Sequence, residues 1–403
     1  MNNRSFIPGL VCAMLGAREH YGPMIMAEKA GWLKLFMTDL WTPWLQPLRN
    51  HVGNSNYRRA AGRFTSGMPS KKVRSFPGLG LRYRWQLKRA CSRSEAYEIY
   101  EQVGSRFAKA ASRYISDSHD VFLGFNSASL EALREGNRIG VRTVLDQIDP
   151  AGVEFDLVAE EEKRFPKLNR GSLPRPNRYF ARISEEWQEA STVIVNSQWS
   201  KSALVRQGVP ESKLAVVPLA FDPGAGGRIR RAWTGELKVL WLGTLCLRKG
   251  LPYAIQAAEK LIGSPVRFTF AGPCDVREDG LSLPSNCKYI GAIPPVDAPR
   301  LYDEHDIFIF PTISDGFGLT QLEALSFGLP VITTPCCGEA VEHKKSGFLI
   351  PASDAQALAE GIQRFVDDPE LLPTMSWEAI LRSRAFRSDR LWPVYGKALW
   401  PAS

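Results

Sequence analysis

The sequence predicts an α/β protein with two doubly wound, parallel-sheet domains that face each other across a cleft. A length of 403 residues, 44% of them hydrophobic, is more than one ordinary core accommodates. In the second half, short apolar runs that end in glycine alternate with amphipathic helical patterns, which is typical of βαβ units. A cluster of proline and glycine at residues 223–227 marks the best linker between two such halves.

The second half has the clearer rhythm of strands and helices. Within it, Leu251, Ala254, Ile255 and Ala258 recur at helical spacing. Because doubly wound sheets bind ligands beyond the carboxyl ends of their strands, chemistry is expected in the loops that follow the strands. The expected strands are 237–243, 266–272, 288–293, 306–311, 330–334 and 347–351, and the expected helices are 251–262, 296–304, 319–327 and 354–366.

The first half shows the same alternation less cleanly. The apolar run at its start could belong to a weak signal peptide, but a first buried strand followed by a polar loop fits it better. The expected strands are 10–15, 33–38, 121–125, 142–147 and 192–195, and the best helices are 94–112 and 177–190. We divide the chain into an N-terminal domain (1–220), a linker (221–236), a C-terminal domain (237–385) and a tail (386–403) that could pack back on the first domain.

The net charge of +9 comes from one region. Residues 40–94 contain twelve Lys or Arg and no Asp or Glu, and tryptophan, tyrosine and phenylalanine are interleaved with them. A basic and aromatic surface suits an anionic bilayer, an anionic acceptor or single-stranded nucleic acid. The alternative is a solvated basic face above aromatic residues of the core. No apolar run approaches the roughly 20 residues that span a bilayer.

Neither a metal nor a disulfide is indicated. The seven cysteines are odd in number and form no C-x-x-C pair, which favours reduced thiols in a cytosolic enzyme. The five histidines are scattered and form no H-x-x-x-H pair, so no intrinsic metal site is expected.

The loop GTLCLRKGL, residues 243–251, leads from a strand into a helix. Glycine permits close approach of the backbone, and a helix N-terminus offers free N–H groups with a partial positive charge. Arg248 and Lys249 add two cations at the same point. The combination suits a diphosphate, although the spacing matches neither a Walker A loop nor G-x-G-x-x-G, and an exposed basic loop is the alternative.

The stretch SDGFGLTQLEALSFGLPVI, residues 314–332, places two carboxylates eight positions apart. Asp315 follows a strand, and Gly316 and Gly318 can turn backbone N–H groups toward a ligand. Glu323 lies in the first turns of the next helix among apolar neighbours, where an isolated charge is costly. Its two oxygens match the paired hydroxyls of a ribose. Alternatively, Glu323 caps its own helix or pairs with a lysine.

These motifs, with FTFAGP, YIGAIP and DIFIFP between them, resemble the C-terminal domain of glycosyltransferase family 4 over residues 237–368. The N-terminal half resembles the family only through GAREHYGP, STVIVNSQWSKSAL and SKLAVVPLAFD. The resemblance implies a GT-B fold, in which an N-terminal acceptor-binding and a C-terminal nucleotide-sugar-binding domain are both Rossmann-like. It also implies a retaining hexosyltransferase that uses a nucleotide-sugar donor and needs neither a metal nor another cofactor.

The resemblance further assigns roles to residues. Asp315 and Glu323 occupy the E-x7-E positions, so that the first would face the donor sugar and the second would bind the ribose. Lys249, with Arg248 beside it, would neutralise the diphosphate. The other donor contacts would come from Gly16, Thr244, Gly291, Ile293, Gly316, Phe317, Gly318 and Leu319, and weaker candidates at the acceptor side of the cleft are Arg18, His20 and Asp149.

The sequence departs from the family pattern at three positions. Asp315 is one methylene shorter than the usual glutamate. Thr244 stands where an arginine is usual, and Arg248 could substitute for it. The histidine that many members carry after the strand 142–147 is absent, because Ile148 takes its place. The residues that could serve instead are Asp149, His119 and His20.

The resemblance leads us to expect a transferase of polysaccharide biosynthesis, cytoplasmic or peripheral at the cytoplasmic face of the membrane. It would move a sugar to a hydroxyl of a glycan, a lipid-linked saccharide or a lipid. Residues 40–94 would face an anionic membrane or acceptor, and no nucleic acid is expected. Two alternatives stay open, a GT-B nucleotide-sugar epimerase and a non-enzymatic nucleic-acid-binding protein that uses residues 40–94.

Overall fold

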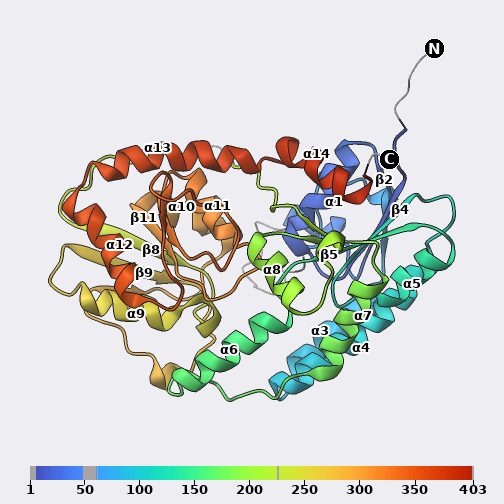
Figure 1. The fold of residues 1–403 in the computed structure, drawn as a ribbon, viewed down its shortest axis with the longest axis horizontal. Coiled ribbons are helices and arrows are strands. Elements are labelled where there is room, and N and C mark those ends of the chain that lie inside the picture. The colour runs from blue at the N-terminus through green and yellow to red at the C-terminus, as the bar shows by residue number, and fades with distance from the viewer. Residues whose placement is uncertain (1–5, 49–59, 61, 225–226, 402–403) are drawn as a thin grey trace, which may run out of the picture.

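The protein folds into two α/β domains that lie side by side (Figure 1). The computed structural model describes residues 6–48, 60, 62–224 and 227–401. The strands of the N-terminal domain are β1 (Leu10–Met14), β2 (Leu33–Thr38), β3 (Val73–Ser75), β4 (Val121–Phe125), β5 (Arg142–Gln147), β6 (Thr192–Val195) and β7 (Leu214–Val216). Its helices are α1 (Gly22–Lys29), α3 (Pro77–Arg89), α4 (Arg93–Ser112), α5 (Leu130–Arg138), α6 (Gly152–Arg164), α7 (Asn177–Glu189) and α8 (Gln198–Arg206).

The C-terminal domain repeats the alternation of strands and helices. Its strands are β8 (Leu237–Leu242), β9 (Val266–Ala271), β10 (Cys287–Tyr289), β11 (Ile307–Phe310), β12 (Val331–Thr333) and β13 (Gly347–Leu349). The helices of the second half are α9 (Leu251–Lys260), α10 (Ala298–Glu304), α11 (Leu319–Ser326), α12 (Ala355–Asp367), α13 (Leu371–Ser383) and α14 (Ser388–Leu399).

Each domain contains one parallel sheet. The first has seven strands in the order β3-β2-β1-β4-β5-β6-β7, and the second has six in the order β10-β9-β8-β11-β12-β13. Every pairing between described strands is parallel. The strand order reverses between β1 and β4 in the first sheet and between β8 and β11 in the second. Such switch points are where doubly wound sheets bind ligands.

The central strands are buried on both faces because helices cover each sheet from two sides (Figure 1). Every residue of β1, β4 and β11 is buried. In the sequence these strands are therefore continuous apolar runs rather than alternating patterns, and such runs allowed the strands to be predicted.

The structure differs from the expected elements mainly at the edges of the sheets. The strands β3 and β7 were not expected, and each has only three residues, too few to show a periodic pattern. The strand expected at 288–293 ends at Tyr289, because Gly291 adopts a φ of 78° and turns the chain.

The last helix, α14, lies on the N-terminal domain, whereas α13 lies along the C-terminal domain (Figure 1). Helix α14 packs against α1, and the rings of Trp392 and Trp32 meet edge to face with centroids 5.2 Å apart. The hydroxyl of Tyr395 donates a hydrogen bond of 2.8 Å to the buried carboxylate of Asp146 on β5. The domains are therefore connected both by the segment before β8 and by the passage from α13 to α14.

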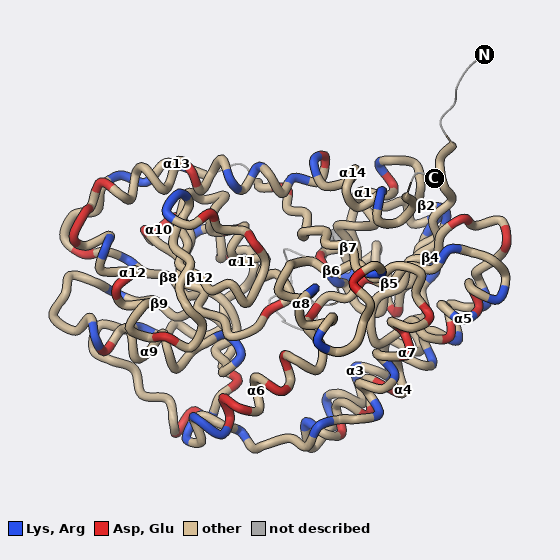
Figure 2. The backbone as a smooth tube through the Cα atoms, viewed as in Figure 1, with Lys and Arg blue, Asp and Glu red and all other residues tan. Residues whose placement is uncertain are grey.

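Acidic and basic residues are spread over both domains (Figure 2). The expectation that all of residues 40–94 forms one basic surface is wrong for Arg63, which is buried and forms an ion pair with Asp39. Lys72 is also engaged, 2.6 Å from the carboxylate of Glu28. Arg49, Arg58 and Arg59 lie outside the described residues.

In the part of the chain that the structure describes, no helix is long and apolar enough to cross a membrane.

Candidate functional site

The loops that follow β8 and β11 form one unit at the switch point of the C-terminal sheet. After β8 the chain makes a 3-10 turn at Leu247–Lys249, and Gly250 adopts a φ of 77° before α9 begins. A side chain at Gly250 would be strained and would overlap the backbone that follows β11. The hydroxyl of Thr312 donates a hydrogen bond of 3.1 Å to the carbonyl of Arg248. The cationic turn is therefore held against the loop that leads to Asp315.

Asp315 is held by both cations of that turn. Its carboxylate forms an ion pair with Lys249 and lies 3.1 Å from Nη1 of Arg248, and its side chain is only 14% exposed. Burial alone would raise the pKa of Asp315, but the charges of Lys249 and Arg248 outweigh burial and lower this pKa to about 2. Asp315 therefore stays ionised at physiological pH, and the cluster keeps more positive than negative charge.

Three consecutive backbone N–H groups, those of Gly316, Phe317 and Gly318, find no acceptor within the described residues. The side chain of Phe317 is buried against Phe386, so only its backbone can face a ligand. Gly318 adopts a φ of 86° and contacts the ring of Phe310 so closely that a Cβ would not fit. Unpaired N–H groups beside two cations form a suitable site for the oxygen atoms of an anionic ligand.

Glu323 lies in the second turn of α11, which begins at Leu319. One carboxylate oxygen accepts a hydrogen bond of 2.6 Å from the hydroxyl of Tyr302 on α10, and the other has no partner in the described part of the chain. Tyr302 is itself buried and stacks on Phe327, with ring centroids 5.5 Å apart. Among described residues, Glu323 neither caps its helix nor pairs with a lysine. The tyrosine thus orients the carboxylate and leaves one oxygen free for a ligand.

Three glycines meet at the carboxyl ends of β8, β9 and β10. The N–H of Gly272 donates a hydrogen bond of 2.8 Å to the carbonyl of Gly291, and a Cβ at Gly272 would overlap the carbonyl of Gly243. Thr244 follows Gly243 directly, and Ile293 follows Gly291 closely in the chain. The predicted donor-binding positions of these loops therefore share one edge of the sheet.

The residues predicted on the N-terminal side lie at the carboxyl edge of the first sheet. The N–H of Gly16, just beyond β1, donates a hydrogen bond of 2.9 Å to Asp39. Nη1 of Arg18 donates to the side-chain oxygen of Asn126, just beyond β4, at 3.2 Å. His20 is exposed and has a φ of 50°. The loop that carries Gly16, Arg18 and His20 therefore follows the first strand on the edge that faces the cleft.

Of the residues that could replace the absent histidine, Asp149 lies on the cleft edge and His119 does not. Asp149 follows β5, and its carboxylate accepts a hydrogen bond of 2.9 Å from the N–H of Ala151 at the start of α6. His119 precedes β4, at the amino end of that strand, and accepts a hydrogen bond of 3.1 Å from the N–H of Ser116 in its own turn. The suggestion that His119 reaches into the site is therefore wrong.

The two domains touch at the loop that follows β11. The hydroxyl of Ser197, at the start of α8, donates a hydrogen bond of 2.7 Å to the carbonyl of Gly316. The indole N–H of Trp199 donates to the hydroxyl of Ser314 at 3.2 Å. The backbone of Gly316 also lies against the carbonyl oxygen of Ile148, which a Cβ would overlap. Glycine is therefore required here by the close approach of the opposite domain.

A glutamate of the N-terminal domain, Glu154, reaches the same cluster. It lies in the first turn of α6, accepts a hydrogen bond of 3.1 Å from the hydroxyl of Ser314 and lies 3.6 Å from Nη1 of Arg248. Burial raises the pKa of Glu154 to about 7 against the charge of Arg248, and the charges of Asp149 and Asp315 add to the rise. A cleft carboxylate with a pKa near neutrality is a candidate functional residue.

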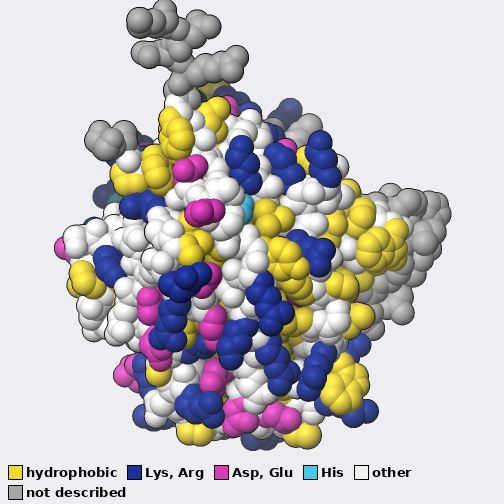
Figure 3. Space-filling model, turned by 90° about the vertical axis from the view of Figure 1, so that its right-hand side faces the viewer, with side chains coloured by type: hydrophobic (Ala, Val, Ile, Leu, Met, Phe, Trp, Pro, Cys, Tyr) yellow, Lys and Arg dark blue, Asp and Glu magenta, His cyan; other side chains and the backbone are white. Residues whose placement is uncertain are grey.

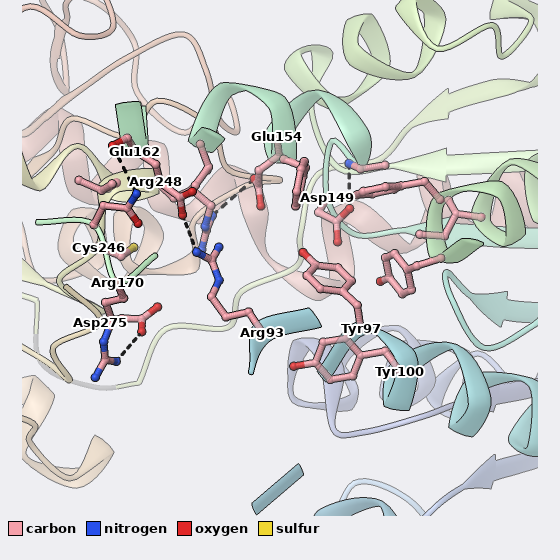
Figure 4. A pocket seen from close by; sticks show the side chains of 18 of the residues that line it. Arg93, Tyr97, Tyr100, Asp149, Glu154, Glu162, Arg170, Cys246, Arg248 and Asp275 are labelled. Carbon is pink, nitrogen blue, oxygen red and sulfur yellow. Dashed lines mark hydrogen bonds and ion pairs between the residues drawn. The ribbon is translucent and has the colours of Figure 1, made fainter. Parts of the chain in front are cut away.

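A pocket of about 310 Å³ opens beside Arg248 (Figure 4). Helices α4, α6 and α7 form the side that belongs to the N-terminal domain, and the turn after β8, with Asp275 beyond β9, forms the side that belongs to the C-terminal domain. Of the predicted site residues, Arg248 and Asp149 line this pocket, whereas Asp315 and Glu323 do not. Arg248 therefore joins the pocket to the Asp315 cluster.

Glu154, Tyr302 and Ser197 were not among the residues predicted from the sequence. Glu154 resembles any acidic residue in the first turn of a helix, where it interacts favourably with the helix dipole. Its position just beyond β5, on the edge where ligand loops gather, is the signal that could have found it. Ser197 is recognisable as the N-cap of α8, whose side chain accepts from the N–H of Ser200, but its bond to the other domain has no local signal. Nothing near Tyr302 in the sequence indicates its bond to Glu323.

Two parallel-sheet domains that meet through the carboxyl edges of their strands define the GT-B fold, as predicted. The chain shares this fold with HepE from Anabaena, solved in complex with UDP and glucose, at a TM-score of 0.61 and 16% identity over 97% of this chain and 99% of that one. Sucrose-phosphate synthase from Thermosynechococcus elongatus matches with a TM-score of 0.62 and 17% identity over 97% of this chain and 98% of that one.

Residues 236–368, which span most of the C-terminal domain, match the family described as "Glycosyl transferases group 1". This finding supports the resemblance noted in the sequence at the level of the group, and membership of family 4 stays a prediction.

Curated proteins with a similar sequence are also glycosyltransferases. The amylovoran biosynthesis glycosyltransferase AmsK of Erwinia amylovora is 29% identical over 221 residues, which are 50% of this chain and 50% of AmsK. The putative colanic acid biosynthesis glycosyltransferase WcaL of Escherichia coli K12 is 27% identical over 224 residues, 49% of this chain and 54% of WcaL. The chain spans about half the length of these curated relatives.

Proposed function

We propose that the chain is a glycosyltransferase of polysaccharide biosynthesis, which moves a sugar from a nucleoside diphosphate donor to a hydroxyl of an acceptor. The observation that carries the proposal is the cluster of Lys249, Arg248 and Asp315 beside the unpaired N–H groups of residues 316–318. The cations suit a diphosphate, the N–H groups suit sugar oxygens, and the free oxygen of Glu323 suits a ribose hydroxyl. The biosynthetic glycosyltransferases AmsK and WcaL among the relatives and the UDP bound by HepE support the same assignment.

The proposed reaction breaks the bond between C1 of the sugar and the diphosphate while the acceptor oxygen forms a bond to C1. Negative charge grows on the departing diphosphate, and the fixed cations Lys249 and Arg248 would stabilise it without rearrangement. We propose that a phosphate oxygen takes the acceptor proton, that the sugar keeps its anomeric configuration and that no metal is required. The resemblance to retaining family members supports these three features.

The test is to incubate the full chain with UDP-glucose, UDP-galactose, UDP-N-acetylglucosamine and GDP-mannose in EDTA, with and without octyl glycosides as acceptors. We expect one donor to release its nucleotide faster when an acceptor is present, and NMR to show the donor's anomeric configuration in the product. Formation of an epimer without an acceptor would instead identify an epimerase. Binding of RNA without binding of any nucleotide sugar would identify a nucleic-acid protein. The comparisons favour neither alternative.

The proposal also places the protein at an anionic membrane surface, through helix α3. Leu81 and Trp85 lie one helical turn apart and are 61% and 54% exposed. Arg82, Lys88 and Arg89 are exposed on the same helix, and the guanidinium of Arg89 lies 4.3 Å from the ring centroid of Trp85. Figure 3 shows basic side chains beside hydrophobic ones toward the bottom of this face, where α3 and α4 lie. Apolar residues flanked by cations suit the interface of an anionic bilayer.

Changing Arg82, Lys88 and Arg89 together to glutamine should weaken binding to vesicles about 100-fold, because each cation near an anionic surface contributes about 1 kcal/mol. Co-sedimentation with vesicles of phosphatidylcholine and phosphatidylserine measures the effect. The matched control changes three exposed lysines of the C-terminal domain, Lys238, Lys260 and Lys288, to glutamine. Equal loss in both variants, or no loss in either, would contradict a role for α3.

A further inference from the structure

The pocket beside Arg248 has a wall of aromatic side chains. None of these side chains is among the residues proposed to bind the nucleotide sugar. Unlike the fully buried aromatic residues of the core, the rings of this wall are only partly buried. They come from α4, α6 and α7, three helices of the N-terminal domain. We use the term aromatic wall for Tyr97, Tyr100, Phe155, Tyr179 and Phe180, all of which line the pocket.

The rings of the aromatic wall hold one another in place. The rings of Tyr97 and Tyr179 meet edge to face with centroids 5.1 Å apart, and those of Phe155 and Phe180 do so at 5.6 Å. Mutual edge-to-face packing fixes the ring orientations before a ligand arrives. A fixed apolar surface of this kind packs well against the C–H face of a sugar ring.

Hydrogen-bonding groups without partners project into the same pocket. One carboxylate oxygen of Glu154 accepts from Ser314, and its other oxygen has no hydrogen-bond partner in the described parts of the chain. The hydroxyls of Tyr97 and Tyr100 likewise make no hydrogen bond to a described residue. Figure 4 shows Glu154, from α6, and these two tyrosines, both from α4, facing the pocket. A carboxylate and phenolic hydroxyls are suited to bind sugar hydroxyls.

The cations at the rim of the pocket are already neutralised. Arg93 lies 2.5 Å from the carboxylate of Glu162, and Arg170 lies 3.0 Å from that of Asp275 (Figure 4). The remaining cation is the arginine that the pocket shares with the Asp315 cluster. The pocket therefore lacks the excess positive charge that a phosphate or carboxylate ligand requires, and it favours a neutral ligand with several hydroxyls.

We propose that this pocket binds a neutral sugar residue of a saccharide acceptor, with one ring face on the aromatic wall and one hydroxyl donating to Glu154. The inference rests on the proposed function and deepens it, because it selects a saccharide over a bare lipid as the acceptor. Arg248 lines the pocket and also contacts Asp315 at 3.1 Å, so the acceptor sugar would lie next to the donor. Glu154 is then an acceptor-binding residue that lies outside the motifs on which the family resemblance rests.

Saturation-transfer NMR on the full chain with UDP tests the proposal. The probes are the methyl glycosides of glucose, galactose, mannose and N-acetylglucosamine, with methyl phosphate as the anionic probe and 1-octanol as the lipid-like one. We expect at least one glycoside to receive saturation, strongest at its ring C–H protons, and neither methyl phosphate nor octanol to compete with it. The variants Glu154→Gln and Phe155→Ala should each weaken its binding about tenfold.

The control variant is Trp377→Ala, which removes a 46% exposed aromatic ring on α13, outside the pocket. It should bind the glycoside like the wild type. Unchanged UDP binding by the two pocket variants shows that they are folded. If the protein binds UDP but no glycoside, or if Glu154→Gln and Phe155→Ala leave glycoside binding unchanged, the pocket inference is wrong while the proposed function stands. If glycosides bind as expected and no nucleotide sugar does, the pocket stands and the proposed function fails.

Discussion

Replacing Lys249 by methionine is expected to slow sugar transfer about 100- to 1,000-fold, because the departing diphosphate loses one of its two fixed cations. Methionine has nearly the length of lysine and can stay over the ring of Phe310, whose centroid lies 4.5 Å from Nζ of Lys249. Arg248 remains 3.1 Å from the carboxylate of Asp315 and keeps it ionised, so the loop should keep its shape. The release of nucleotide at saturating donor and acceptor measures the rate.

The matched control is Lys260→Met, at the exposed end of α9 in the same domain. This control should transfer sugar at the wild-type rate. A Lys249→Met variant that is as fast as Lys260→Met would show that Lys249 does not stabilise the leaving group. The same assay in EDTA separates this result from a requirement for a metal.

Replacing Gly316 by alanine is expected to lower kcat about 100-fold and to weaken donor binding much less, because a misplacement of about 1 Å between reacting groups can have that effect on the rate. The added Cβ would overlap the carbonyl oxygen of Ile148, so the two domains must separate at this point. Lys249 and Asp315 both belong to the C-terminal domain and keep their contact. The loss should therefore appear in transfer rather than in donor binding.

Small-angle scattering and donor titration check the two parts of this prediction. Gly316→Ala should give a larger radius of gyration than the wild type in the presence of donor, and its Kd for the donor should rise far less than its kcat falls. The control is Gly224→Ala in the segment before β8, where a Cβ would meet nothing within 4 Å. A wild-type kcat in Gly316→Ala would show that the contact with Ile148 is not needed for catalysis.

Most of the fold could be predicted because its central strands are buried on both faces. The runs at β1, β4 and β11 are apolar throughout, and helices at regular spacing follow them. The short edge strands β3 and β7 carry no such pattern, because three residues that are at most partly buried fit the hydrophobic pattern of a strand, a helix or a loop equally well. The ends of strands were also uncertain, since a turn such as the one at Gly291 depends on a single dihedral angle.

The candidate site was predictable where its chemistry is local. Arg248 and Lys249 are adjacent, and Asp315 and Glu323 lie within one loop and helix, so the spacing indicated two candidate motifs, and the family resemblance assigned both to one nucleotide-sugar site. Their pairing across 66 residues was not predictable from either motif alone. Glu154 is 160 residues from Ser314, its hydrogen-bond partner. The aromatic wall draws on three helices that only the folded chain brings together.

The claim that the cluster around Asp315 binds a nucleotide sugar is tested most directly by thermal unfolding of the wild type and of Glu323→Ala with each donor. At a donor concentration of 100 times Kd, binding stabilises a protein by about 2.7 kcal/mol, which raises Tm by several degrees. We predict such a rise with one donor in the wild type and in the exposed-surface control Glu360→Ala, and little or none in Glu323→Ala. An equal rise in all three proteins, or no rise with any donor in the wild type, would contradict the proposed site.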